Sequence, residues 1–539
     1  MRVLCFGLDG ADYDLVNDLV ARGRMPTVAR LTREGAFGAL RSTLPAVTPT
    51  AWSSFLTGLN PGGHGIFYFT TNPNRAQSRV ENAASRGGVP FWHALGAAGM
   101  RSAFIGIPFT YPPDPIDGIL VTGYGGPPQP EIVPEAARER ILAAHPDLVT
   151  AHHPMAERWW EDFEGYTAGL LTHVEQTADV CRLAIELEPD LRLLCVDFMS
   201  SDFAGHLGYH RLDPSHPAHR PEEAGDELVQ VYEAIDRACG QLLEVAAERF
   251  GEEPTALVLS DHGMKPIHWV FHLNHWLEQE GYLRYRRRSL QALRGGRLDF
   301  AARVDHRLGR TKPAYARMLD RLPLPSPRPD RAFADIDFGK TRAYCYGAGG
   351  QIFLGEASGA LRDPGVARDL EQALTSVRHP ETGQPAFTVA RKEELYSGPF
   401  VHKGPEFILL PLDERIFVEA SRRASEATFE RHDHLDPERH SGYSGHHGVR
   451  GILAAAGPGI RMGDVPEGAE ITQVPATLLA LLGLEGELEA PPIGEILDAE
   501  PPRRRADVAV GTRPTREKPV YSPDEEARMI ERLRDLGYE

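Results

Sequence analysis

Short apolar runs alternate along this chain with longer segments that have helical periodicity. The runs contain few polar positions, which is typical of strands buried on both faces of a sheet. They are Val3–Leu8, Ala103–Ile107, Leu191–Val196, Ala256–Leu259, Phe407–Leu410 and Ile452–Ala456. The main helical segments are Val89–Ala98, Tyr166–Leu187, Glu222–Arg249 and Gln473–Leu482. This alternation predicts an α/β fold, an α/β/α sandwich around a mostly parallel central sheet.

The length of 539 residues allows more than one core, so we expect the sandwich to carry an inserted cap or accessory region. The predicted parts are a first core part at 1–280, an insertion and small accessory lobe at 281–405, a second core part at 406–500, and a linker with a C-terminal amphipathic helix at 501–539. The insertion contains Pro323–Pro329, whose prolines exclude a helix or a central strand. The terminal helix, Pro523–Leu536, is expected to pack on the body or on a partner.

Composition argues against several kinds of partner. The chain has 58 basic and 76 acidic residues, and a net charge of −18 disfavours nucleic-acid polymers and anionic membranes. Its apolar segments all fall short of the ~20 residues needed to span a bilayer, and the segment 1–10 lacks the features of a signal peptide. The five cysteines form no C-x-x-C motif, so neither a zinc ribbon nor a redox site is indicated. We therefore expect a cytoplasmic protein with no membrane partner, and composition leaves the oligomeric state open.

Carboxylate and imidazole side chains stand next to several of the predicted strands. They are Asp9, Asp202, His206, Asp261, His262 and either His446 or His447. Asp202 and His206 have the i, i+4 spacing that places two side chains on one side of a helical turn. Because open α/β sheets build their sites at the carboxyl ends of strands, we expect these groups to meet. Oxygen and nitrogen ligands without a thiolate suit zinc or manganese, and two such ions can hold both the attacking and the leaving oxygens of a displacement.

A hydroxyl group precedes a helix-like stretch at Thr48-Pro-Thr-Ala-Trp. The first amides of a helix are an anion site, so Thr48 would lie where a phosphate could bind. A threonine hydroxyl is a poor nucleophile unless a metal or a base activates it. Taken alone, Thr48 is interpreted as a helix cap, and His64, in a glycine-rich turn, as a structural residue.

Five separated motifs give these residues a common context. They are Leu8-Asp9-Gly10, Thr48–Ile66, Asp202–His206, Ser260–Gly263 and His447–Ile452. In this order they resemble the alkaline phosphatase superfamily, and within it the type I phosphodiesterase/nucleotide pyrophosphatase family. The resemblance covers roughly residues 1–490, apart from the segment 281–340, and implies an alkaline phosphatase-like fold.

The resemblance implies a phosphoric ester hydrolase with two divalent metal ions, most commonly zinc, with manganese as the alternative. One ion would be held by Asp202, His206 and His447. The other would be held by Asp9, Asp261, His262 and the oxygen of Thr48. Thr48 would attack phosphorus in a small-molecule phosphodiester or phosphomonoester and form a phospho-threonine, with Thr50 as the alternative nucleophile.

One position departs from the family pattern. Nucleotide pyrophosphatases carry a phosphate-binding asparagine shortly after His-Gly-Ile, whereas this chain has an aromatic residue, Phe69. Phosphate oxygens would then be bound by the backbone near Thr48, by Thr70 or Thr71, or by the metals alone. We predict Thr50 and Thr70 as substrate-binding residues. This departure argues against specificity for nucleotides. All the predicted metal ligands are still present in the sequence.

Other activities of the superfamily stay open at this point. Phosphonate hydrolysis would use the same nucleophile and metals, whereas a phosphomutase usually carries serine at the nucleophile. Sulfatases need a Cys/Ser-x-Pro-x-Arg segment, which the sequence at Thr48 does not provide. A non-catalytic metal-binding or ligand-binding relative is the alternative from another class, although all seven ligand positions are filled.

Overall fold

The computed structural model describes most of the chain. The described residues are 1–72, 79–150, 162–286, 333, 335–355, 364–420, 427–435, 442–486, 488–498, 504–505, 521 and 526–530. The predicted proline-rich segment Pro323–Pro329 lies outside them, as does most of the predicted terminal helix. Within the described part of the chain, no helix is both long and apolar enough to cross a lipid bilayer.

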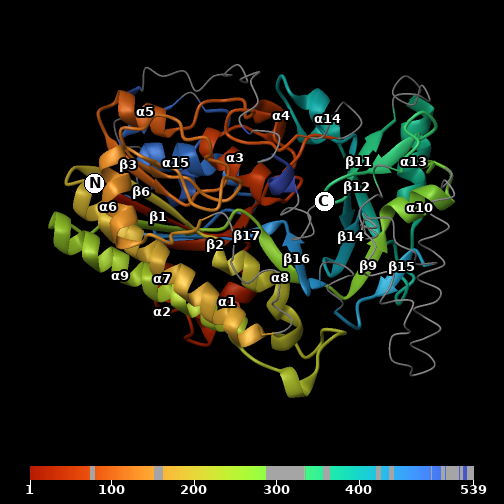
Figure 1. The fold of residues 1–539 in the computed structure, drawn as a ribbon, viewed down its shortest axis with the longest axis horizontal. Helices are drawn as coiled ribbons and strands as arrows, with labels where there is room; N and C mark the ends of the chain where they lie inside the picture. Colours follow the sequence, from red (N-terminus) through yellow and green to blue (C-terminus); the bar gives the residue numbers. More distant parts are fainter. Residues whose placement is uncertain are drawn as a thin grey trace, which may run out of the picture.

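A nine-stranded sheet forms the centre of the molecule (Figure 1). Its order is β18-β2-β17-β7-β1-β6-β3-β4-β5. The strands are β1 Val3–Leu8, β2 Ala36–Arg41, β3 Arg101–Ile105, β4 Gly118–Val121, β5 Ile132–Val133, β6 Leu191–Phe198, β7 Thr255–Leu259, β17 Arg450–Ala456 and β18 Gly463–Asp464. The central strand β1 is parallel to both neighbours, β6 and β7, whereas β17 and β5 run the other way. The predicted mostly parallel central sheet is therefore confirmed.

Helices cover both faces of this sheet, because its strands present apolar side chains on each side. In β1 the side chains of Val3 and Cys5 belong to one buried cluster, and those of Leu4, Phe6 and Leu8 belong to the other. The first cluster includes residues of α3 Thr48–Thr57, α5 Trp92–Ala97 and α15 Val474–Leu481. The second includes residues of α1 Tyr13–Ala21, α2 Pro26–Glu34, α6 Glu135–Ala144, α7 Phe163–Leu187, α8 Ser200–Leu212 and α9 Glu227–Phe250. Figure 1 shows the two helical layers on opposite sides of the sheet, which is the predicted α/β/α sandwich.

Two smaller sheets lie beside the sandwich, at the right of Figure 1. The four-stranded sheet, in the order β10-β11-β13-β12, contains β10 Ala343–Cys345, β11 Gln351–Leu354, β12 Phe387–Arg391 and β13 Phe407–Pro411. The three-stranded sheet, β14-β9-β15, contains β9 Trp269–His272, β14 Ile416–Glu419 and β15 Phe429–Arg431. Nearby helices are α10 Leu273–Gln279, α13 Pro364–Ser376 and α14 Lys392–Leu395.

The predicted strand Phe407–Leu410 exists but does not extend the large sheet. It lies in β13, which pairs antiparallel with β11 and β12. The prediction that this strand begins the second part of the core was therefore wrong. An apolar run predicts that a strand is buried, but it does not predict which other strand it pairs with. The predicted division into domains is otherwise not tested and stays a prediction.

A small antiparallel pair of strands lies at the edge of the large sheet. It consists of β8 Gly263–Pro266 and β16 Gly445–Gly448. Strand β8 follows β7 after three residues, and β16 precedes β17 after one. This pair therefore ties the ends of two sheet strands together beside the carboxyl end of β1 (Figure 1).

Candidate metal centre

Three adjacent parallel strands are each followed by a carboxylate residue at the same edge of the sheet. Asp9 follows β1, Asp261 follows β7 with one residue between, and Asp202 lies in the first turn of α8, just after β6. All three residues have 0% exposure. Strands β7, β1 and β6 are neighbours in the sheet, so the chain folds these distant carboxylates into one site.

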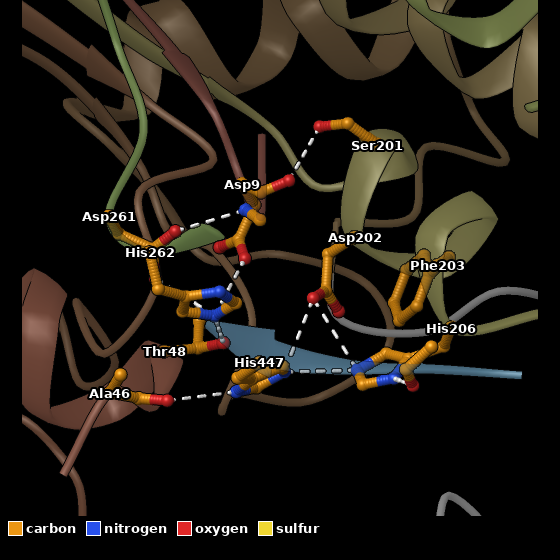
Figure 2. A network of polar contacts seen from close by, with 12 residues as sticks. Asp9, Ala46, Thr48, Ser201, Asp202, Phe203, His206, Asp261, His262 and His447 are labelled. Atoms are coloured by element: carbon orange, nitrogen blue, oxygen red, sulfur yellow. Dashed lines mark hydrogen bonds and ion pairs between the residues drawn. The ribbon is translucent and has the colours of Figure 1, made fainter. Parts of the chain in front are cut away.

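The first ligand group consists of Asp202, His206 and His447 (Figure 2). The Nε2 atoms of His206 and His447 lie 3.5 and 3.4 Å from Asp202 Oδ1. The two Nε2 atoms are 3.0 Å apart. These three side chains are the ones that the resemblance assigned to one ion.

The second ligand group consists of Asp9, Asp261 and His262. His262 Nε2 lies 3.6 Å from Asp9 Oδ1 and 3.4 Å from Asp261 Oδ2. Thr48, the first residue of α3, places its Oγ1 atom 3.3 Å from the same nitrogen (Figure 2). The rings of His262 and His447 stack with centroids 3.8 Å apart, so the two groups are in contact.

Backbone carbonyl oxygens fix the orientation of all three imidazoles. His206 Nδ1 donates to the carbonyl of Gly445 at 2.9 Å, and His447 Nδ1 donates to that of Ala46 at 3.1 Å. His262 Nδ1 donates to the carbonyl of the next residue at 3.0 Å. A carbonyl oxygen only accepts, so Nδ1 carries the hydrogen and Nε2 turns its lone pair toward the carboxylates. This second contact on Nδ1 is the usual arrangement of metal-binding histidines.

The polar atoms of this site fit two divalent cations. Four carboxylate oxygens, Asp9 Oδ1, both of Asp202 and Asp261 Oδ2, are buried and have no hydrogen-bond partner among the described residues. Burial, together with the neighbouring carboxylates, raises the pKa of Asp9 well above its usual value, and burial raises that of Asp261 to about 7. Burial also lowers the pKa of His206 and His262 to about 4. Buried carboxylates beside neutral imidazoles require a cation or protons, and this donor set suits zinc.

Several residues that sequence reasoning did not single out support the ligands. Trp52 Nε1 donates to Asp9 Oδ2 at 2.8 Å, and Ser201 Oγ donates to the Asp9 carbonyl at 2.7 Å. The ring of Tyr443 stacks on His206 with centroids 4.2 Å apart. Trp52 lies one helical turn after Thr48, a spacing that could have suggested the contact. The stacking of Tyr443 had no comparable signal in the sequence.

The predicted substrate-binding residues are placed differently from the ligands. Thr50 lies in the first turn of α3, is 0% exposed, and its hydroxyl has no hydrogen-bond partner among the described residues. Thr70 lies in an isolated bridge with Val80, and its hydroxyl hydrogen-bonds to the hydroxyl of Tyr346. Neither threonine belongs to a ligand group, so their roles stay predictions.

Two further histidines lie near the site without joining it. His446 points away from the ligands because successive side chains of a strand alternate in direction, and its Nε2 donates to the Glu414 carbonyl at 2.7 Å. The structure thus brings His447, and not His446, together with Asp202 and His206. His64 is buried and bonds through Nε2 to Ser54 Oγ at 2.9 Å, in the structural position expected for it.

Comparison with known protein families decides the class of this site. The family described as type I phosphodiesterase / nucleotide pyrophosphatase matches residues 3–432. The chain belongs to this family. It is accordingly a metal-dependent phosphoric ester hydrolase acting on small phosphoesters, and the resemblance predicted from the motifs is confirmed. His447 lies beyond the matched range, and the geometry alone places it in the first ligand group.

The other comparisons add less. No curated protein matches the chain. Among solved structures, human ectonucleotide pyrophosphatase / phosphodiesterase 5 aligns at 15% identity with a TM-score of 0.48. The alignment covers 93% of this chain and 100% of the human one. The family assignment does not depend on it.

Proposed function

We propose that this member of the family hydrolyses a phosphodiester or phosphomonoester through Thr48 as nucleophile, at a centre that binds two zinc ions, with manganese as the alternative metal. The observation that carries the proposal is the presence of two separate three-residue ligand groups in contact. Thr48 Oγ1 adjoins one of them at 3.3 Å. A single ion would leave one buried group of carboxylates and imidazoles without a cation.

The proposed holders of the ions follow from the two groups. Asp202, His206 and His447 would bind one ion, and Asp9, Asp261, His262 and Thr48 would bind the other. Bound there, two divalent ions supply positive charge to the attacking, leaving and phosphoryl oxygens. The nitrogen and carboxylate donors suit zinc best, and manganese accepts a similar set.

The chain itself positions the nucleophile. Thr48 is fully buried at the start of α3, so its side chain has little freedom. His262 Nδ1 donates to a carbonyl, so its Nε2 lone pair would face the proposed ion, and Thr48 Oγ1, 3.3 Å from that nitrogen, would adjoin the same ion. In the first step Thr48 Oγ1 gives up its proton and forms a bond to phosphorus, while the bond to the leaving oxygen breaks and that oxygen takes up a proton. Water then cleaves the phospho-threonine, and the hydroxyl regains its proton.

The substitution Thr48→Ala tests the assignment of the nucleophile. We expect turnover of p-nitrophenyl phosphate and bis-p-nitrophenyl phosphate to fall at least a thousandfold, because the attacking oxygen is lost. The metal content of the zinc-loaded variant should stay near two per chain, since six ligands remain. Thr50→Ala is the comparison variant, because Thr50 is equally buried in the same helical turn and is the alternative nucleophile.

The same assays separate the alternatives. Comparing the two substrates, with zinc or with manganese, distinguishes diesterase from monoesterase activity. Full activity of Thr48→Ala together with loss of activity in Thr50→Ala would show that Thr50, and not Thr48, is the nucleophile. A wild-type protein that binds no zinc or manganese would contradict the proposal as a whole.

A further inference from the structure

A buried ammonium group lies beside the metal centre but outside its ligand set. Lys265 belongs to β8 and is 8% exposed. Its Nζ atom lies 3.0 Å from Asp12 Oδ2, 2.7 Å from Asp14 Oδ2 and 3.6 Å from Glu414 Oε2. A lysine is rarely buried unless it is paired. These carboxylates come from two segments that are far from Lys265 in the sequence.

The first of these segments follows the ligand Asp9. Asp12 is buried, and its side chain caps α1 by accepting from the backbone N–H groups of Asp14 at 3.0 Å and Leu15 at 3.3 Å. The contact of Lys265 with Asp12 and Asp14 therefore fixes the turn that leads from β1 into α1. Asp9, at the start of that turn, belongs to the second ligand group.

The remaining contacts lead to the strand that carries His447. Lys265 is paired with His446 across the β8–β16 pair, and the next pair joins Met264 to His447. His446 donates to the backbone carbonyl of Glu414, whose carboxylate faces Lys265. A side-chain carbon at Gly448 would lie 3.1 Å from Lys265 Cγ, so the lysine stem packs closely against β16.

Lys265 itself lies four residues after Asp261 and three after His262. Lys265 thus joins three segments. Its ammonium group pairs with the segment after Asp9, its own strand follows the Asp261–His262 pair, and its backbone and stem lie against the strand that carries His447. The first two segments supply the second ligand group, and the third supplies part of the first. No other lysine among the described residues is both buried and paired with three carboxylates.

We propose that Lys265 is a positioning residue that holds the two ligand groups at the separation required to bind both metal ions. This inference rests on the proposed function, because a fixed separation matters only if both groups bind ions. Lys265 does not contact the ligand atoms in the structure, so it would act through the three segments. The alternative is that Lys265 stabilises the fold without affecting the metal centre.

The substitution Lys265→Met tests this role, because methionine keeps most of the apolar stem and removes the charge. Zinc affinity is measured by competition with a chelator, and the geometry of the centre by the visible absorption of the cobalt-substituted protein. We expect Lys265→Met to bind one of its two ions at least tenfold more weakly and to show an altered cobalt spectrum. Lys265→Arg, which keeps the charge, should recover most of the affinity.

Lys340→Met is the matched control. Lys340 also pairs with a carboxylate, Asp337 Oδ2 at 3.3 Å, but its side chain is 76% exposed and lies far from the ligand segments in the sequence. This variant should keep the zinc affinity and cobalt spectrum of the wild type. If Lys265→Met fails to fold, Asp14→Asn serves instead, because it removes one partner that is 57% exposed. It should weaken the binding of one ion about threefold.

The outcomes separate the two proposals. A Lys265→Met protein with lowered thermal stability but wild-type zinc affinity and cobalt spectrum would show a purely structural role and overturn the inference. The same conclusion would follow if Asp14→Asn, used as the substitute, bound zinc as tightly as the wild type. A wild type that binds only one ion would contradict the proposed function before Lys265 is considered.

Discussion

At the scale of single residues, the proposed metal centre depends on contacts made by the side of each ligand residue that faces away from the proposed ions. Each imidazole donates a hydrogen bond from Nδ1 to a backbone carbonyl, and Asp9 accepts a hydrogen bond from the indole N–H of Trp52. Such contacts fix both the rotamer and the protonation state of a ligand. They explain how five buried side chains and the half-buried His447 can present lone pairs to the same small volume.

Trp52→Phe tests this support at Asp9. The change keeps an aromatic ring but removes the 2.8 Å hydrogen bond to Asp9 Oδ2, which leaves a buried acceptor unpaired at a cost of about 1–3 kcal/mol. We expect weaker zinc binding at the group of Asp9, Asp261 and His262, measured by chelator competition.

Trp92→Phe provides the control for this experiment. Trp92 is 1% exposed in the same helical layer, and its indole nitrogen has no hydrogen-bond partner among the described residues. Its replacement should leave zinc affinity unchanged. Equal losses in both variants would show that repacking of the layer, and not the contact to Asp9, determines the affinity.

The residues of the two candidate ligand groups could be singled out from sequence because their types and spacing restrict their chemistry. Asp202 and His206 lie one helical turn apart, and both are in the first group as expected. The residues alone left His446 and His447 open, the resemblance favoured His447, and the structure places His447 in the first group. The partners of Thr70 could not be foreseen, because Tyr346 is distant in sequence.

At the scale of secondary-structure elements, the turn after α3 carries a histidine that the fold requires to be neutral. His64 ends α4 Pro61–His64, and its Nδ1 accepts from the Ile66 N–H at 3.1 Å. Its Nε2 therefore donates to Ser54 Oγ. Burial, with the nearby charges of Arg86 and Lys403, lowers the pKa of His64 to about 3.

This neutral histidine predicts a loss of stability in acid. The folded state resists protonation of His64 while the unfolded chain binds the proton near pH 6.5, so stability falls as pH decreases from 6.5 toward 3. At pH 5 the loss from this one group is about 2 kcal/mol. Urea unfolding at pH 7 and pH 5 should therefore show a smaller acid-induced loss for His64→Gln than for the wild type. An equal loss in both proteins would mean that His64 is not responsible.

At the scale of the whole molecule, the sandwich could be predicted and the accessory sheets could not. Strands such as β1 and β6 are buried on both faces, so their composition is distinctive. Strand β12 has only one fully buried residue, and the apolar run in β13 contains no information about its partners. The sequence therefore indicated which edge of the large sheet carries the candidate ligand groups but not how the strands of the smaller sheets beside it pair.

The stereochemistry of hydrolysis tests the central claim most directly. A phosphodiester that carries two different oxygen isotopes in a defined configuration at phosphorus is hydrolysed by the zinc-loaded wild type in water enriched in the third isotope, and the configuration of the chiral phosphomonoester product is determined. Attack by Thr48 followed by attack of water comprises two in-line displacements, so the account predicts net retention of configuration. Net inversion would show a single displacement by water and would contradict the assignment of Thr48 as the nucleophile.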